Sequence, residues 1–228
     1  MSDKGIREYR MIEPGDRILV AVSGGKDSAA LARVLASWKS HSRERFDLHC
    51  LHIATDFGSN GGQFPLRELF RTWDLPCSEI LVKVVGRLKE GERMNCWWCS
   101  TQRRTELIKF ATRGGWNKIA LGHHLDEIVE TFFMNMLNKG EISTMPPVMK
   151  YRKYPVTVIR PLCLVEERQL IDLAEELGIS GVTCTCDYDS LSERKAVRKR
   201  IETFTEGSSR AKRNIFKAMK NVKDEYLT

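Results

Sequence analysis

A six-residue segment, Ser-Gly-Gly-Lys-Asp-Ser at residues 23–28, lies between an apolar run and a stretch of good helix formers. The apolar run, residues 18–22, is typical of a buried parallel strand. Residues 29–35 are rich in alanine and leucine and are apolar on one face, which predicts a helix. The chain is therefore expected to pass from a strand through a tight glycine turn into a helix.

This turn has the groups needed to bind a phosphate. Backbone N–H groups and the dipole of the following helix both point towards an incoming anion. Gly24 and Gly25 allow a close approach that a side chain would prevent. Ser23 and Ser28 can donate hydroxyl hydrogen bonds, and Lys26 can neutralise phosphate charge.

Asp27 completes the segment and could either hold a divalent metal or cap the helix. The spacing differs from the Walker pattern, because four residues do not separate a glycine from the Gly-Lys pair, so γ-phosphate chemistry is not implied. The alternative is a plain glycine turn between a strand and a helix.

Strand-like and helical segments alternate along the rest of the chain. We predict strands at residues 17–22, 46–53, 80–85, 118–121 and 156–160, and helices at residues 28–40, 63–73, 100–113, 122–138 and 166–177. This alternation predicts an α/β fold with a doubly wound parallel sheet. The first, second and fourth strands then end at one ligand-binding edge, where Ala54 is expected to contact a nucleotide.

Length and composition suit a soluble protein. With 228 residues, 42% apolar and 29% charged, the chain can form one domain with an appendage. We predict a nucleotide-binding domain at residues 1–180 and a basic helical extension, packed on it, at residues 181–228. No apolar run approaches the ~20 residues of a membrane span. The charged start lacks a signal region, so we expect a cytoplasmic protein without a membrane partner.

Positive charge is concentrated near the C-terminus. The chain has a net charge of +7, and residues 193–223 contain eleven Lys or Arg and three Glu, a local net charge of about +8. Helices predicted at residues 193–201 and 211–223 would carry this charge, which suggests a polyanionic partner such as nucleic acid. The alternative is an ordinary solvated helix face.

A second segment repeats the logic of the first. The strand at residues 118–121 is followed by Gly-His-His-Leu-Asp-Glu at residues 122–127, which opens a helix. Two imidazoles and two carboxylates at a sheet's ligand edge suit magnesium and phosphate, so Gly122, His123 and Asp126 are candidate site residues. Acidic residues at a helix start would also suit the helix dipole without any further function.

Four of the seven cysteines form two close pairs, at residues 96/99 and 184/186. From their spacing alone they could be a redox pair, a zinc site or part of an iron–sulfur site. Cys50, Cys77 and Cys163 lie in or beside apolar runs, and we expect each to be a small buried residue. An odd number of cysteines in a reducing compartment argues against a disulfide framework.

Residues 23–28 resemble the pyrophosphatase loop, SGGxDS, of the ATP pyrophosphatase (PP-loop) superfamily. The resemblance implies cleavage of ATP between its α and β phosphates, with AMP placed transiently on a substrate oxygen. Residues 122–127 resemble the GHHxDD signature of tRNA-modifying members, with Glu127 in place of the last aspartate. Lys26, Asp27 and Asp126 would then be the catalytic groups, with Mg²⁺ held by Asp27 or Asp126.

The chain is also similar to the tRNA 2-thiocytidine synthetase family, from residue 18 to about residue 219. The likeness rests on motifs that occur in the order and rough spacing of that family: Cys96 and Cys99, residues 122–126, Met134-Asn135, Met145-Pro146-Pro147 and Ile159-Arg160-Pro161-Leu162.

Members of this family carry a [4Fe-4S] cluster on three cysteines, with the fourth iron open to bind sulfur. The resemblance implies that Cys96 and Cys99 are two of the ligands. Cys186 is preferred over Cys184 as the third, because its distance to the residues that follow fits the family better. Two differences stand out, since the chain is shorter than the best-known members and has Cys-x-Cys where they have Cys-x-x-Cys.

The resulting hypothesis is an ATP-dependent tRNA sulfurtransferase. It would adenylate a pyrimidine carbonyl oxygen in the anticodon loop, with cytidine C2 as the preferred target, and replace that oxygen with sulfur. Expected partners are tRNA and a sulfur donor such as a cysteine desulfurase, and a homodimer is left open. The alternatives are a tRNA-lysidine-synthetase-like ligase, an amidating enzyme, and a non-catalytic tRNA-binding module containing zinc or an iron–sulfur cluster.

Overall fold

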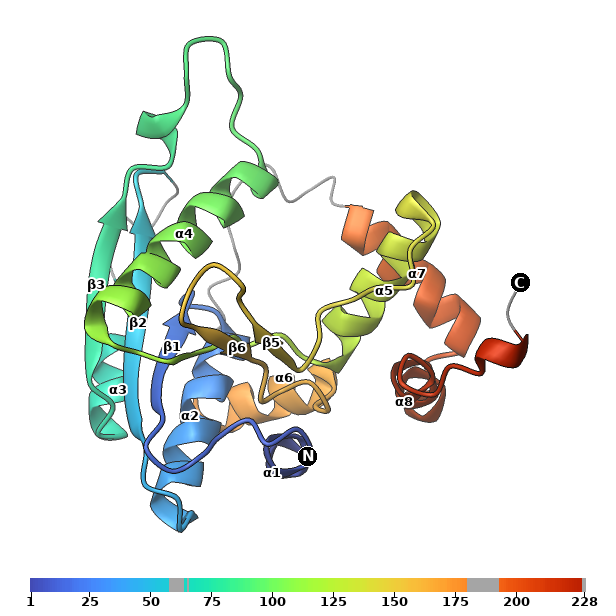
Figure 1. Ribbon diagram of the computed structural model, residues 1–228, viewed down its shortest axis with the longest axis horizontal. Helices are drawn as coiled ribbons and strands as arrows, with labels where there is room; N and C mark the ends of the chain where they lie inside the picture. Colours follow the sequence, from blue (N-terminus) through green and yellow to red (C-terminus); the bar gives the residue numbers. More distant parts are fainter. Residues whose placement is uncertain (58–63, 65, 180–192, 227–228) are drawn as a thin grey trace.

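The computed structural model describes residues 1–57, 64, 66–179 and 193–226. Six strands form one sheet in the order β3-β2-β1-β4-β6-β5 (Figure 1). They are β1 (Arg17–Val22), β2 (Asp47–Thr55), β3 (Cys77–Val82), β4 (Lys118–Ala120), β5 (Val148–Lys150) and β6 (Thr157–Ile159). Neighbouring strands are parallel except for β5 and β6, which are antiparallel. The predicted doubly wound α/β fold is confirmed.

Helices cover both faces of this sheet. They are α1 (Ser2–Glu8), α2 (Lys26–His41), α3 (Arg67–Thr72), α4 (Cys96–Gly114), α5 (Leu125–Lys139), α6 (Glu167–Glu176), α7 (Glu193–Thr205) and α8 (Ser209–Ala218), with 3-10 turns η1 (Val85–Arg87) and η3 (Asp224–Tyr226). In β1, Ile18 and Val20 pack into the core shared with α2, α5 and α6, whereas Leu19 packs into the core shared with α4. Because successive side chains of a strand point to opposite faces, a strand that is covered on both faces has apolar residues at consecutive positions.

The order of the strands decides which loops meet. The connections β1–α2, β4–α5 and β6–α6 all leave from the carboxyl ends of strands that are neighbours in the sheet. Three loops far apart in the sequence therefore lie side by side at one edge. The start of α4 belongs to the same edge, because this helix links the carboxyl end of β3 back to β4 (Figure 1).

Three expectations need correction. No strand was predicted between residues 138 and 156, but β5, a three-residue strand, lies there and pairs with β6 at the edge of the sheet. Helix α4 begins at Cys96 rather than near residue 100, because the Asn95 side chain accepts a hydrogen bond from the backbone N–H of Trp98 and so caps the helix earlier. Cys77 is half-buried rather than buried, since β3 is the other edge strand.

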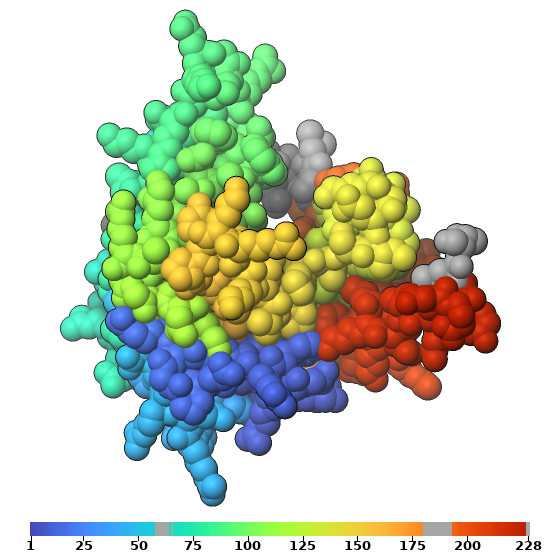
Figure 2. Space-filling model, in the orientation of Figure 1, coloured from blue at the N-terminus to red at the C-terminus, as the bar shows by residue number. Residues whose placement is uncertain are grey.

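The two C-terminal helices pack against the body through α5. In the space-filling view they form a red lobe beside the yellow end of α5 (Figure 2). Among the helices that the structure describes, none is both long and apolar enough to cross a membrane. The predicted division near residue 180 stays a prediction, because residues 180–192 lie outside the described ranges.

Candidate nucleotide and sulfur-transfer site

The glycine turn at residues 23–28 is held by its two serines. Ser28 Oγ donates to the carbonyl of Gly25 at 2.8 Å and lies 3.2 Å from both the backbone nitrogen and Oγ of Ser23. Gly24 has a φ of +90°, a conformation that side chains rarely adopt, which explains a glycine at this position. The turn therefore leads directly into the N-terminus of α2, where its N–H groups can receive a phosphate.

Gly122 packs against this turn. A Cβ at this position would lie 3.2 Å from the carbonyl oxygen of Asp27 and 3.4 Å from the backbone nitrogen of Ser28. Both neighbours are backbone atoms, so only a glycine allows the β4–α5 loop to approach this closely. The two motifs selected from the sequence are thus in direct contact.

Lys26 lies between two carboxylates. Its Nζ is 3.0 Å from Asp27 Oδ1 and 3.4 Å from Oε1 of Glu167, the first residue of α6. Burial alone would lower the pKa of Lys26, but the two carboxylates outweigh it and raise that pKa. Lys26 is therefore a fixed positive charge beside the glycine turn. Apart from its ion pair with Lys26, the buried Asp27 Oδ1 makes no hydrogen bond within the described ranges and keeps a lone pair for a further ligand.

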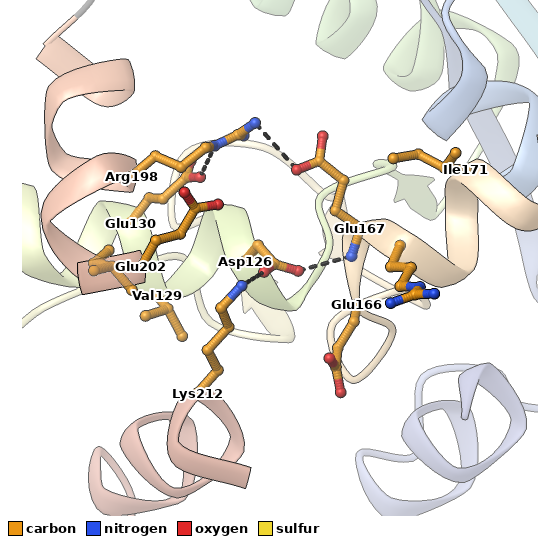
Figure 3. Close-up of a pocket in the computed structure, with 11 residues that line it drawn as sticks. Asp126, Val129, Glu130, Glu166, Glu167, Ile171, Arg198, Glu202 and Lys212 are labelled. Atoms are coloured by element: carbon orange, nitrogen blue, oxygen red, sulfur yellow. Dashed lines mark hydrogen bonds and ion pairs between the residues drawn. The ribbon is translucent and has the colours of Figure 1, made fainter. Parts of the chain in front are cut away.

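Asp126 joins three helices (Figure 3). Its Oδ1 lies 2.8 Å from Lys212 Nζ of α8, and its Oδ2 accepts a 2.7 Å hydrogen bond from the backbone N–H of Glu167. Burial would raise the pKa of Asp126, but His124, Lys212 and this N–H together hold it well below its usual range. Both oxygens already have partners, so a role for Asp126 as a metal ligand would require Lys212 to move.

His123 is held neutral by its surroundings. Burial, and then the nearby charge of Arg160, lower the pKa of His123 to about 3. The Arg160 Nε donates to His123 Nδ1 at 3.3 Å, while its Nη1 donates to the carbonyl of Pro146. The backbone N–H of Arg160 bonds to the carbonyl of Pro147. The Met-Pro-Pro and Ile-Arg-Pro-Leu segments therefore meet around one buried arginine next to the histidine motif.

His124 lies between two acids inside the same loop. Its Nδ1 is 3.6 Å from Asp126 Oδ2 and its Nε2 is 3.9 Å from Glu127 Oε2. Burial lowers the pKa of His124, but the carboxylates of Asp126, Glu127 and Asp27 raise it by more. Burial also raises the pKa of Glu127. The site is therefore built to hold compensating charges close together.

Cys96 and Cys99 lie on the first turn of α4. Residues three apart on a helix share a face, and Cys96 is exposed while Cys99 is half-buried. Trp98 anchors the helix start by donating from Nε1 to the carbonyl of Val84, whereas Trp97 is 73% exposed. Within the described part of the chain, no group of three or more His, Cys, Asp or Glu residues is placed to hold a metal ion. Cys184 and Cys186, the candidates for a third ligand, lie outside the described residues.

Ala54 is buried near the end of β2. Its neighbour His52 pairs with Val22 in the sheet register, so Ala54 lies two residues further towards the glycine turn. Its contact with a nucleotide stays a prediction. His49 and His52 are sheet residues of β2; His49 bonds to Ser78 and His52 to the carbonyl of Val22.

The basic C-terminal helices use several of their cations internally. Glu130 of α5 has only 2% of its side chain exposed and binds Arg194 at 3.2 Å and Arg198 at 2.6 Å. In α8, Lys212 binds Asp126, and Arg213 binds Glu166 at 2.7 Å. The net charge of residues 193–223 therefore overstates the positive charge that these helices can offer to a partner. Lys199 and Arg200 are nevertheless exposed.

Two residues of this region were missed from the sequence. Glu130 lies one turn after the histidine motif, and Glu167 is the second of two adjacent glutamates that open α6. The signal for Glu167 was its place in an acidic pair, Glu166 and Glu167, shortly after a predicted strand and the Ile-Arg-Pro-Leu segment. That acidic pair was interpreted as an ordinary helix start.

Known proteins match the whole chain. The model of a family described as the PP-loop domain matches residues 3–203. A tRNA-cytidine(32) 2-sulfurtransferase of Alkalilimnicola ehrlichii is 35% identical, over 100% of this chain and 73% of that protein. A protein of the same name from Syntrophotalea carbinolica is 31% identical, over 100% of this chain and 89% of that protein.

Solved structures share the fold. The U34-tRNA thiolase NcsA of Methanococcus maripaludis, solved with its [4Fe-4S] cluster, superposes with a TM-score of 0.80 at 18% identity, covering 100% of this chain and 80% of that one. The NMN synthetase of Francisella tularensis superposes with a TM-score of 0.53 at 15% identity, covering 100% of this chain and 94% of that one. At these identities the likeness concerns the fold alone.

Proposed function

This chain belongs to the PP-loop family and is a relative of the tRNA-cytidine(32) 2-sulfurtransferases, and we propose that it is itself an ATP-dependent tRNA sulfurtransferase. The proposed substrate is the C2 carbonyl of a cytidine in a tRNA loop, at position 32 as in the names of the relatives. A base in a loop can be unstacked and reached by a protein.

The observation that carries the proposal is that a candidate phosphate-binding turn and a pair of candidate metal-binding cysteines lie at the same edge of the sheet. The phosphate-binding turn at residues 23–28 and the Cys96/Cys99 helix start belong to the same edge of the sheet. A lysidine-forming ligase or an amidating enzyme would need the first and have no use for the second. A non-catalytic RNA-binding module would need neither the glycine turn nor a lysine held beside it.

The first step activates a poor leaving group. The C2 oxygen of the base attacks the α-phosphorus of ATP, the bond between the α and β phosphates breaks, and pyrophosphate leaves. The N–H groups of the glycine turn and the Lys26 ammonium would stabilise the charge that grows on the departing phosphates. Asp27 fits as a ligand for Mg²⁺, because its Oδ1 has only the Lys26 ammonium as a partner within the described ranges; Mg²⁺ would supply further charge compensation when bound.

The second step replaces the oxygen. A sulfur nucleophile attacks C2, the carbon–oxygen bond breaks, and AMP departs with the original oxygen. A [4Fe-4S] cluster, when bound, would supply that sulfur. Cys96 and Cys99 suit two of its ligand positions, because they share one helix face at an accessible N-terminus that favours thiolates. Cys186 is the proposed third ligand, with Cys184 as the alternative.

The test combines a metal assay with a product assay. Protein purified without oxygen should contain about four irons and four sulfides per chain. With ATP and a sulfur donor it should form 2-thiocytidine in tRNA, detected by mass spectrometry of digested nucleosides. The Cys96→Ala/Cys99→Ala variant should lose both properties.

The matched control is Cys77→Ala, which removes a half-buried thiol on the edge strand β3. It should keep both iron and product. Zinc in place of iron would contradict cluster chemistry, and release of pyrophosphate without any thiolated base would favour the ligase or amidating alternatives.

A further inference from the structure

Glu167 contacts three functional parts of the molecule at once. Its Oε1 lies 3.4 Å from Lys26 Nζ, its backbone N–H donates to Asp126, and its Oε2 lies 3.1 Å from Nη1 of Arg198 in α7. Glu167, Asp126 and Arg198 line a cavity of about 220 Å³ between α5, α6, α7 and α8 (Figure 3). One carboxylate therefore touches the phosphate-binding lysine and a basic C-terminal helix.

The contact with Lys26 has a mechanical consequence. A lysine ends in a compact charge on a flexible four-carbon stem, so an isolated lysine samples many positions. Asp27 approaches the ammonium as the next residue in the chain, and Glu167 approaches it from a different helix. Two carboxylates from separate helices restrict the ammonium to one place. This positioning favours catalysis, because the ammonium must contact the departing phosphate.

Arg198 extends this contact into α7. Its Nε lies 2.6 Å from the buried Glu130 and its Nη1 reaches Glu167, so the rigid guanidinium bridges two carboxylates. Lys199 and Arg200 follow it directly and are exposed. A phosphate bound by these two residues would act on the same helical turn that holds Glu167.

From these contacts we infer that Glu167 is a positioning residue, which sets the place of Lys26 and couples it through Arg198 to RNA bound on α7. The inference rests on the proposed function and deepens it. It assigns no direct contact with ATP to Glu167. It predicts that occupation of α7 by tRNA changes the rate at which ATP is cleaved.

The first experiment compares two adjacent glutamates. Glu167→Gln keeps the shape and the backbone N–H but removes the charge facing Lys26. Glu166→Gln is the matched control, because Glu166 binds Arg213 and Ser209 of α8 and has no contact with Lys26. Pyrophosphate release is measured at saturating tRNA over a range of ATP concentrations, with thermal unfolding as a check of folding.

We expect Glu167→Gln to lower the maximal rate of pyrophosphate release by about tenfold or more, while the KM for ATP stays within about threefold. Glu166→Gln should keep the wild-type rate. Equal behaviour of the two variants, or a faster reaction in Glu167→Gln, would overturn the positioning role. A wild-type protein that forms no pyrophosphate from ATP and tRNA would instead refute the proposed function itself.

The second experiment tests the coupling to α7. Arg198→Lys keeps a positive charge but cannot bridge two carboxylates, and Arg168→Lys makes the same change at an exposed residue lining the same cavity. The measured quantity is the ratio of pyrophosphate release with and without saturating tRNA. The ratio should fall by about fivefold or more in Arg198→Lys and stay unchanged in Arg168→Lys. An unchanged ratio in Arg198→Lys would refute the coupling.

Discussion

Adding a single methyl group at Gly122 tests whether the two motifs act as one site. In Gly122→Ala the new Cβ would lie 3.2 Å from the carbonyl oxygen and 3.3 Å from the carbonyl carbon of Asp27. Ordinary carbon contacts begin near 3.5 Å, so the backbone must shift by a few tenths of an ångström. Overpacking of this kind typically costs about 1–3 kcal/mol.

The cost should appear mainly in ATP binding. The atoms that must move belong to the turn at residues 23–28, which is otherwise held by the hydrogen bonds of Ser28. If about 1.4 kcal/mol of the cost falls on the nucleotide-binding conformation, the Kd for ATP rises about tenfold. Isothermal titration calorimetry measures the Kd, and a thermal scan shows the part of the cost that falls on folding, at roughly 2–4 °C per kcal/mol.

Gly5→Ala is the matched control, because it makes the same chemical change inside α1. Its Cβ would meet Cys163 Sγ and the carbonyl of Pro161 no closer than 3.5 Å, an ordinary contact. Alanine also favours a helix over glycine by up to about 1 kcal/mol, so Tm should stay level or rise while the Kd for ATP is unchanged. A Gly122→Ala variant with wild-type Kd and Tm would refute the close contact between the motifs.

Three further predictions concern charge. The pKa of His123 is about 3 in the folded protein against an ordinary value of 6.5, so folding disfavours its protonation. The wild-type free energy of unfolding should therefore fall between pH 7 and pH 5, as measured by urea unfolding. In His123→Gln the free energy of unfolding should fall less over the same pH interval. Glu130→Gln leaves two arginines without their shared buried anion and should lower the free energy of unfolding by about 2–3 kcal/mol, measured by the urea midpoint; an unchanged midpoint would contradict the anchoring role. The double variant Lys199→Glu/Arg200→Glu should weaken tRNA binding and make the slope of log K against log salt concentration less steep by roughly one to two. The control variant Lys39→Glu, at the far end of α2, should change neither the affinity nor the slope.

The sequence was informative where one local pattern determined one local structure. The apolar run before Ser23, the glycines and the helix formers after Ser28 each favour a single conformation, and together they predicted the turn. The second motif could be placed beside the first because both follow predicted parallel strands. The contact through Gly122 could not be predicted, because it depends on a few tenths of an ångström between backbone atoms.

Ionic partners were beyond the reach of the sequence. A run of basic residues does not reveal which cations are used internally, since Arg198 meets Glu130 and Lys212 meets Asp126 across 68 and 86 residues of chain. The short strand β5 was missed because three residues give too little pattern to distinguish a strand from a loop.

The ion pairs of α8 bear on how far the protein could be shortened. Lys212 neutralises Asp126, the carboxylate of the histidine motif, and Arg213 neutralises Glu166 at the start of α6. A chain ending before residue 208 would keep its whole sheet and its glycine turn, yet it would expose uncompensated negative charge beside a site intended for a polyanion. We therefore expect α8 to contribute to the charge balance of the proposed ATP site, so truncation should reduce nucleotide affinity even where the fold survives.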